Sequence, residues 1–483
     1  MIKHASKTYD CIIIGGGISG LISGNYLARA GLKTLVLEKN ANVGGYCVSF
    51  SRKGYAFDAC VCALSGFEKG GSFYKICSEL HIEKELILVN YDIPDIVMTS
   101  EKRCLFNKDP IKATESLSKC FPKEQVNIRR FMGLLHSSPT LSLTSLRNKS
   151  FQELLDIYFK EEELKTYFSL ILFGYSGVPP WELSAFYACT IYRDFIFNGG
   201  YYPLGGMETF SDVLANKFRK SGGELVTSIK VNRIIIEKQK ATGVILDGGQ
   251  PLYSKYVISA CDSFQTYNYL IGSEHLRESK KRILAIRKPS MSAFVVYLGV
   301  NKNLTALPNL RSHIWYIARN EKSFEKIYQN LLKEEFDFVG ITSPSLKNNI
   351  SLIPREKESV FLFINMPFRN NEYWTEENKE RISLKLLILA SRAMLEIGSN
   401  IEVKIVASPS TLYKWTLNHC GAAYGWAGSV SQFGDPEFSE ITGIENLSMV
   451  GHWVNRGSGV NAVANTGRLV AKNLIKRFSE LNT

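Results

Sequence analysis

Long apolar runs are missing from this 483-residue sequence. No stretch reaches the roughly 18 apolar residues that a helix needs to cross a bilayer. The early apolar run Cys11–Ile14 is too short for the apolar part of a secretory signal, and glycines follow it at once. We therefore expect a cytoplasmic protein that is either free in solution or peripheral on one face of a membrane.

The sequence also lacks the residue spacings of metal sites and of serine hydrolases. Its ten cysteines are scattered, Cys60 and Cys62 form the one close pair, and no Cys/His spacing offers four ligands to zinc. HExxH and GxSxG do not occur. These absences argue against a zinc enzyme and a nucleophile-elbow hydrolase, and they predict no metal and reduced, mostly buried thiols.

Negative charge is in deficit, because 58 Lys and Arg face 46 Asp and Glu, which gives a formal net charge of +12. Such an excess suits nucleic acid, an acidic substrate or an anionic membrane surface. The basic residues are spread thinly and are not interleaved with stacking aromatic residues. We therefore expect no nucleic-acid partner and favour phospholipid headgroups.

What the sequence does contain is a dinucleotide fingerprint near its start. Tyr9–Ile14 is typical of a buried strand, and Gly15, Gly17 and Gly20 form GxGxxG at the start of the helix that follows. The three glycines allow a tight turn, close approach of the backbone to a pyrophosphate, and close packing of helix on strand. Glu38 ends the next strand, where an acidic side chain accepts ribose hydroxyls, which favours FAD or NAD over NADP.

A resemblance to a known family favours FAD. The run Asp10–Asp58, with its paired Gly44 and Gly45, resembles the extended FAD fingerprint of the amine oxidase and phytoene desaturase superfamily. In that family the paired glycines let the loop pack against the phosphates of the cofactor. Many members carry an arginine just after the pair, where this chain has Tyr46 and Cys47.

Two later blocks extend the resemblance over almost the whole chain. Tyr202–Met207 and the helix after it resemble the second signature of the family, in which the residue matching Val231 lies against the adenine through its backbone. Asn446–Val460 resembles the strand and helix that meet the ribityl chain and isoalloxazine ring in carotenoid desaturases, prolycopene-type isomerases and retinol saturases. Where many members have a carboxylate for the ribityl chain, this chain has His452, whose neutral imidazole can make the same hydrogen bond.

The motifs and the resemblance together name the expected site. The FAD contacts are Gly15, Gly17, Ile18, Ser19, Gly20, Glu38, Lys39, Gly44, Gly45, Val231, Ala260, Gly451, Gly459 and Val460. His452 is the candidate for acid–base chemistry, and His419 is the other histidine in this region. Either histidine can equally be a structural hydrogen-bonding group.

The expected fold class is α/β, with a discontinuous Rossmann-type FAD-binding domain of the glutathione reductase-like kind. Residues 1–92, 198–275 and 401–483 are assigned to it, and the β-rich runs between 225 and 260 predict a small meander that closes back onto a parallel sheet. Residues 93–197 and 276–400 are assigned to an inserted substrate-binding, or lid, domain of mixed helix and sheet.

The function expected from the resemblance is an FAD-dependent oxidoreductase: a desaturase, saturase or isomerase of a lipophilic polyene or isoprenoid chain. The ring-rich segment from Tyr167 to Tyr202 fits either the core of a helix pair or a tunnel for such a substrate. Two alternatives stay open. One is a flavin amine oxidase, and the other is a carrier of lipidated proteins of the Rab escort and GDP-dissociation-inhibitor type, which keeps GxGxxG without catalysis.

Overall fold

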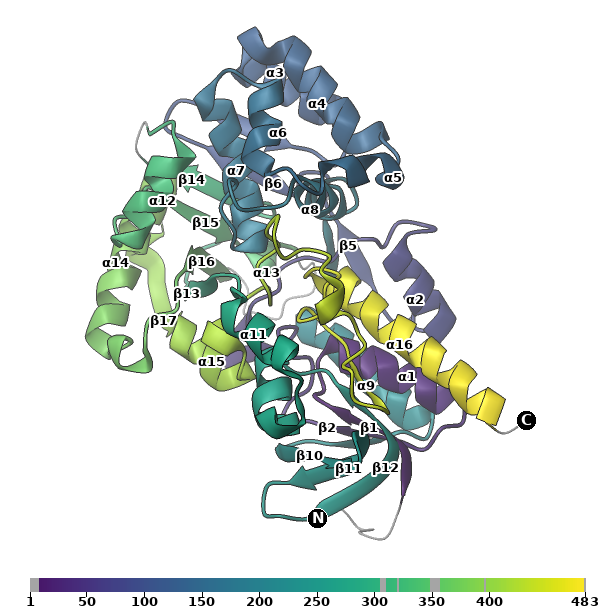
Figure 1. The fold of residues 1–483 in the computed structure, drawn as a ribbon. Coiled ribbons are helices and arrows are strands. Elements are labelled where there is room, and N and C mark those ends of the chain that lie inside the picture. Colours follow the sequence, from purple (N-terminus) through teal and green to yellow (C-terminus); the bar gives the residue numbers. More distant parts are fainter. Residues whose placement is uncertain (1–7, 305–309, 319–320, 348–356, 395–396, 482–483) are drawn as a thin grey trace.

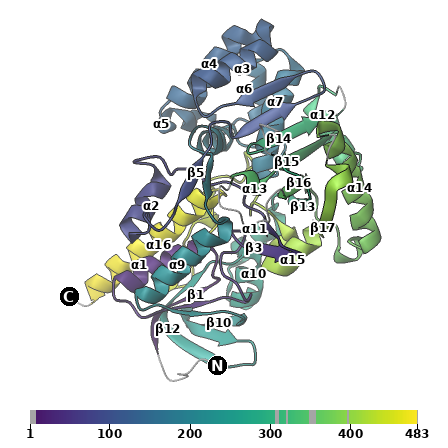
Figure 2. The same ribbon diagram turned by 180° about the vertical axis from the view of Figure 1, so that it is seen from behind.

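Two seven-stranded sheets, each with its own helices, and two small two-stranded sheets form the described part of the molecule (Figure 1). The computed structural model describes residues 8–304, 310–318, 321–347, 357–394 and 397–481. The first sheet lies near both chain ends, and the second lies between the mostly helical segment before residue 200 and the helix α14 (Figures 1 and 2). Within the described part of the chain, no helix combines the length and the apolar content needed to span a membrane.

The core of the first sheet is parallel and runs in the order β9, β2, β1, β12, β18. These strands are β1 (Tyr9–Ile14), β2 (Thr34–Leu37), β9 (Glu224–Val226), β12 (Pro251–Ser259) and β18 (Leu447–Met449). Continuous apolar runs form such strands because helices and further chain bury both faces of a parallel sheet. The sheet thus joins strands from three separate stretches of sequence.

A meander extends this sheet, as predicted. β10 (Val231–Glu237) and β11 (Lys240–Leu246) pair antiparallel, and β11 pairs antiparallel with the first residues of β12. The later residues of β12 pair in parallel with β1, so this one strand belongs to both the meander and the parallel core. The predicted closure of the meander onto the sheet is confirmed.

Three long helices pack together against this sheet. α1 (Ile18–Arg29) contacts both α9 (Met207–Lys220) and α16 (Val460–Leu481), and α2 (Ser72–Leu80) packs on the outer side of α16 (Figures 1 and 2). α1 and α16 approach closely because Gly467 has no side chain: a Cβ there would lie 2.5 Å from the carbonyl oxygen of Ser19. The C-terminal helix therefore covers the first helix of the chain.

The second sheet has seven strands, of which β14 and β6 form the one parallel pair. In spatial order they are β17 (Ile401–Ala407), β13 (Ser292–Val300), β16 (Glu358–Met366), β15 (Phe338–Thr342), β14 (His313–Ile317), β6 (Asp95–Met98) and β7 (Arg103–Phe106). Its main helices are α3 (Pro110–Cys120), α4 (Gln125–Ser137), α6 (Phe151–Tyr158), α7 (Glu162–Ser176), α8 (Ala185–Tyr192), α12 (Phe324–Leu332) and α14 (Glu376–Ala393).

Shorter elements connect the two sheets. The short strands are β3 (Ser49–Arg52), β4 (Tyr55–Asp58), β5 (Leu88–Asn90) and β8 (Tyr201–Pro203), and β3 pairs with β4 and β5 with β8. The short helices are α5 (Thr140–Leu143), α10 (Ser263–Gln265), α11 (Glu278–Ile286), α13 (Pro344–Lys347) and α15 (Pro409–Thr416).

Two expectations need correction. The FAD-binding domain was expected to resume at residue 401, yet β17 pairs antiparallel with β13 and is an edge strand of the second sheet. The thiols were expected to be reduced, yet Cys104 and Cys120 form a disulfide because β7 and α3 bring their Cα atoms within 6.3 Å. Neither contact has a local sequence signal, since the pairing of β17 with β13 and the packing of α3 beside β7 create them. The other eight cysteines are free.

Candidate functional site

A cavity of about 620 Å³ joins the glycine turn of the first sheet to side chains of the second sheet. All the residues predicted to contact FAD line it, with the exception of Gly20. A Cβ on Gly20 would collide with the carbonyl oxygen of Gly15, so this glycine keeps α1 close to β1, as the third glycine of the fingerprint was expected to do. The volume is in the range of cofactor and small-molecule sites.

The glycine turn leaves open space at the N-terminus of α1. Gly15 has φ +103°, a conformation that glycine adopts readily, and Gly17 is the N-cap of α1. A Cβ on Gly17 would meet nothing within 4 Å. Backbone N–H groups and the positive end of the helix dipole therefore face an open part of the cavity, which suits a pyrophosphate.

The second glycine pair lies directly against the first turn. The N–H of Gly44 donates to the carbonyl oxygen of Gly16 at 2.8 Å, and Gly44 has φ +114°. A Cβ on Gly45 would lie 3.4 Å from the Cα of Gly17. The two loops therefore form one continuous wall of backbone. Gly44 has no room for a side chain, because a Cβ there would collide with Ser211 and Cys47.

The carboxylate of Glu38 is fixed at the edge of this wall. It accepts hydrogen bonds from the N–H of Gly16 at 2.7 Å and of Asn40 at 2.8 Å, and the residue is 7% exposed. The next residue, Lys39, also lines the cavity and donates from Nζ to the carbonyl oxygen of Trp415. The geometry at Glu38 fits the expected contact with ribose hydroxyls.

The C-terminal block brings a second helix N-terminus to the cavity. Gly451 has φ +107°, and its N–H donates to Oγ1 of Thr466 at 2.9 Å. Gly459 has φ +96° and precedes Val460, the first residue of α16. A Cβ on Gly459 would lie 2.9 Å from the ring of Phe195, which belongs to the segment beside the second sheet.

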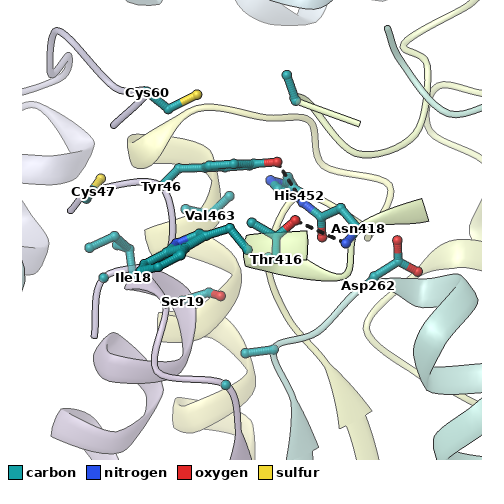
Figure 3. Close-up of a pocket in the computed structure, with 18 of the residues that line it drawn as sticks. Ile18, Ser19, Tyr46, Cys47, Cys60, Asp262, Thr416, Asn418, His452 and Val463 are labelled. Carbon is teal, nitrogen blue, oxygen red and sulfur yellow. Dashed lines mark hydrogen bonds between the residues drawn. The ribbon is translucent and has the colours of Figure 1, made fainter. Parts of the chain in front are cut away.

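Figure 3 shows a polar group around His452 at this wall. Asn418 Nδ2 donates to the hydroxyl of Tyr46 at 3.0 Å and lies 3.4 Å from Nε2 of His452, while Trp453 Nε1 donates to Asn418 Oδ1 at 3.0 Å. Burial lowers the pKa of His452 to about 4. The imidazole is therefore neutral at physiological pH and suits a hydrogen-bonding role better than that of a cationic acid.

His419 does not line this cavity. Its ring stacks on Phe264 with the ring centroids 4.0 Å apart, and the backbone N–H of His419 donates to the Asp262 carboxylate. Asp262 does line the cavity, and burial raises its pKa to about 7. The carboxyl that follows β12, and not His419, is thus the titratable group at this edge of the site.

The ring-rich segment divides between core and cavity. The hydrophobic core around the second sheet contains Tyr167, Phe168, Phe173 and Tyr192. Of the aromatic residues between 167 and 202, Tyr175 and Phe195 line the cavity, with their rings stacked at 4.6 Å. Core packing therefore explains most of this segment.

Sequence reasoning missed several lining residues. They include Tyr46, Cys60, Val61, Cys62, Asp262, His313, Asn418 and Tyr424. Tyr46 directly follows Gly45 and could have been found from that position alone. No local sequence motif marks His313. The pairing of β14 with β6 places this residue at the site.

These features fit FAD. The glycine walls and the α1 N-terminus would hold the pyrophosphate, Glu38 the ribose, and the wall of Gly451, His452 and Val460 the flavin end. A bound flavin supplies an acceptor or donor of hydride, while the chain positions the substrate and shields it from water. Within the described residues, no group of three or more potential ligand side chains could hold a metal ion.

Comparisons with known proteins identify the family of this chain. Residues 18–475 match the family described as flavin containing amine oxidoreductase. A 4,4'-diapophytoene desaturase of Methylomonas sp is 24% identical, with 97% of this chain and 95% of the relative covered. Prolycopene isomerase 2 of an Oncidium hybrid cultivar is 25% identical over 96% of this chain and 84% of the relative.

Another relative and a solved structure extend the comparison. The all-trans-retinol 13,14-reductase of Rattus norvegicus is 24% identical, with 88% of this chain and 78% of the relative covered. The crystal structure of an oxidoreductase from Methanosarcina mazei has a TM-score of 0.68 at 19% identity, covering 96% of this chain and 99% of that one. The solved structure shows a shared fold.

Proposed function

The chain belongs to the flavin-containing amine oxidoreductase family, and from that premise we propose that it is an FAD-dependent oxidoreductase acting on a lipophilic polyene or isoprenoid-like chain. The observation that carries this proposal is the continuous cavity from the glycine turn to the second sheet. One end carries the backbone donors for a dinucleotide, and the other offers an apolar site for the substrate.

The second-sheet end of the cavity supports a greasy substrate. Its wall includes apolar side chains, namely Ala293, Val295, Phe195, Phe361 and Phe363. Three relatives are named for such chains: a 4,4'-diapophytoene desaturase, a prolycopene isomerase and an all-trans-retinol 13,14-reductase. We assign FAD binding to the predicted contact residues, and substrate binding to 93–197 and 276–400 with β17 added.

Anaerobic flavin spectroscopy tests this proposal. The purified protein should carry the absorption bands of oxidised flavin, and a 4,4'-diapophytoene-type polyene should bleach them if the enzyme desaturates. The reduced protein should convert all-trans-retinol to a dihydro product if it saturates, and prolycopene should change geometry without net redox if it isomerises. A coloured protein that leaves all three unchanged by mass spectrometry and chromatography contradicts the proposal.

The two alternatives have distinct outcomes in the same assay. Bleaching by an aliphatic amine, with release of hydrogen peroxide in air, would identify an amine oxidase. Relatives that are named for carotenoids and for retinol argue against this outcome. A colourless protein that does not take up added FAD would identify a carrier.

The substrate chemistry also suggests where the protein works. We assign it to an anionic membrane surface, from which it would draw its substrate. The net charge of +12 supports this location, as do the exposed side chains of Ile111 and Val126 on α3 and α4, which are 68% and 67% exposed. Exposed Lys123 and Arg129 lie near Val126 along the same part of the chain. Such a surface combines apolar insertion with attraction to anionic headgroups.

A further inference from the structure

A chain of four polar side chains, three of them buried and one partly buried, ends at the second-sheet part of the cavity. Asp95 and His313 are register partners on the adjacent strands β6 and β14. Tyr175 lies near the end of α7, and Lys347 is the last residue of α13. Tyr175 and His313 line the cavity, whereas Asp95 and Lys347 lie behind them, 0% and 1% exposed.

Hydrogen bonds connect the four in one line. The Tyr175 hydroxyl donates to Oδ2 of Asp95 at 2.8 Å and lies 2.8 Å from Nδ1 of His313. The other ring nitrogen of His313, Nε2, lies 3.4 Å from Nζ of Lys347. The line therefore runs from an ammonium group through an imidazole and a phenol to a carboxylate.

The donors in this line determine the tautomer of His313. Burial holds its pKa well below the usual range, so the ring is neutral and carries one N–H. Because the one hydrogen of Tyr175 points to Asp95, Nδ1 of His313 must be the donor to Tyr175. Nε2 then accepts from Lys347, and each donor points from Lys347 toward Asp95.

The two ends of the line, Asp95 and Lys347, have similar affinities for a proton. Burial raises the pKa of Asp95 to about 7 and lowers the pKa of Lys347 to about 8. Trp315 Nε1 fixes the carboxylate by donating to its Oδ1 at 2.6 Å, and Lys347 also donates to the carbonyl oxygen of Cys62 at 3.0 Å. Near neutral pH, the Lys347 ammonium can release a proton and the Asp95 carboxylate can accept one.

We propose that Tyr175, His313, Lys347 and Asp95 form a proton relay for the substrate, with Tyr175 Oη as the atom that exchanges the proton. Desaturation with hydride transfer to a flavin releases a proton from a substrate carbon, and saturation delivers one, so this inference rests on the proposed function. Tyr175 is the catalytic residue, and the other three act through it as positioning residues.

The relay balances in both directions. To protonate a carbon, Tyr175 Oη gives up its hydrogen and takes the Nδ1 hydrogen of His313, whose Nε2 takes one from Lys347. To deprotonate a carbon, Tyr175 takes the substrate proton and passes its own to Asp95 Oδ2. The accompanying hydride belongs to the flavin. A buried ionic chain contributes little net stability, because desolvation offsets its attraction, so stability alone does not account for the arrangement.

Nitrogen NMR of the FAD-loaded protein tests the relay without a substrate. With ¹⁵N-labelled histidine, the His313 signal is assigned by its loss in His313→Gln. We expect a neutral ring with the proton on Nδ1. In Asp95→Asn, the N–H of Trp315 should hold the oxygen of the new side-chain amide, so the NH₂ group of that amide faces Tyr175 as a donor. The Tyr175 hydroxyl then accepts from the amide and donates its own hydrogen to Nδ1 of His313. The ring proton should move to Nε2.

The matched control is Glu163→Gln, which changes the carboxylate that accepts from Tyr167 on the same helix at 3.0 Å. It should leave the His313 tautomer unchanged. A wild-type ring protonated on Nε2, or a tautomer that Asp95→Asn does not change, overturns the relay. If Asp95→Asn does not fold, Tyr175→Phe serves instead, because its ring keeps the stack on Phe195 and the Nδ1 proton should lose its acceptor. An unshifted Nδ1 signal there overturns the relay as well.

Kinetics supply the second readout, with whichever polyene the flavin assay shows to be converted. Tyr175→Phe should lower kcat by about 10²- to 10⁴-fold, the usual contribution of a positioned acid or base, with FAD content and polyene Kd unchanged. Tyr167→Phe, a buried tyrosine on α7 outside the cavity, should leave kcat unchanged. Equal kcat in Tyr175→Phe and wild type overturns the relay. If no polyene is converted, the proposed function fails while the NMR result still decides the tautomer chain.

Discussion

Gly17 faces open space at the N-terminus of α1, and this single position tests cofactor binding. In Gly17→Val a branched side chain would occupy the space that suits the pyrophosphate, so the purified protein should lose its flavin. The fold should persist, because a Cβ there meets nothing within 4 Å. Flavin absorbance per polypeptide, with circular dichroism as the fold check, measures the result.

The control for this variant is Gly133→Val in α4. A Cβ on Gly133 also meets nothing within 4 Å, and the residue does not line the cavity. It should keep the flavin at the wild-type ratio. Stoichiometric FAD in Gly17→Val would contradict the assignment of the pyrophosphate site.

His452 makes the free energy of unfolding depend on pH. Its pKa is about 4 in the fold against 6.5 for an ordinary histidine, so between these values the unfolded chain binds the additional proton. The stability that the neutral ring provides is complete above pH 6.5 and is lost as the pH falls toward 4. The full difference is about 3 kcal/mol, at roughly 1.4 kcal/mol for each pKa unit.

The variant His452→Gln tests this. A glutamine keeps a polar group beside Asn418 and does not titrate, so the loss of stability between pH 7 and 4.5 should be smaller than in the wild type by about 2 to 3 kcal/mol. Urea denaturation at both pH values measures it. The same acid-induced loss in both proteins would show that His452 does not stay neutral in the fold.

Among the elements, the contact between α1 and α16 depends on Gly467. Its missing side chain lets the carbonyl oxygen of Ser19 and the hydroxyl of Ser23 approach, at 2.5 and 3.0 Å from the position of a Cβ. Gly467→Val should separate the helices and lower the free energy of unfolding by about 1 to 3 kcal/mol, the usual result of overpacking. Asn473→Val, at an exposed position of the same helix, is the control. Equal urea midpoints for the two variants would contradict close packing here.

Elements with a strong local pattern could be predicted from the sequence. The first strand, the glycine turn and α1 follow from GxGxxG, and the meander follows from β-rich runs separated by turn residues. The disulfide, the position of β17 and the place of His313 in the cavity could not be predicted. The positions of β17 and His313 depend on strand pairing between segments far apart in the chain, and the disulfide depends on how α3 packs beside β7, so neither kind of contact leaves a periodicity in one segment alone.

For the whole molecule, the sequence predicts a single dinucleotide site. No second GxGxxG lies between a strand and a helix, so the FAD-loaded protein should show no stoichiometric tight binding of NADH or NADPH in titration calorimetry. Binding at one equivalent with a micromolar or lower Kd would contradict this and would identify a nicotinamide as the electron partner.

Binding to an anionic membrane would also be a property of the whole molecule. The protein should sediment with anionic liposomes at low salt, stay in the supernatant with neutral liposomes, and be released by added salt. Arg129→Glu should weaken binding at least about fivefold, since each basic residue near the surface contributes about 1 kcal/mol. Lys476→Glu makes the same charge change on α16, far from α4 in Figure 1, and should bind as the wild type does. A supernatant fraction that is the same with both liposomes contradicts the assignment.

The closing of the first sheet by β18 and α16 has a consequence for synthesis in the cell. A ribosome releases β1 and α1 long before α16, so one face of α1 stays uncovered while the more than four hundred residues between the two helices are added. The flavin wall around Gly451 is complete once the last helix has emerged and packed on the first. A complete cofactor site therefore requires that α16 has been synthesised, and a chain interrupted before α16 leaves the apolar face of α1 that contacts this helix uncovered.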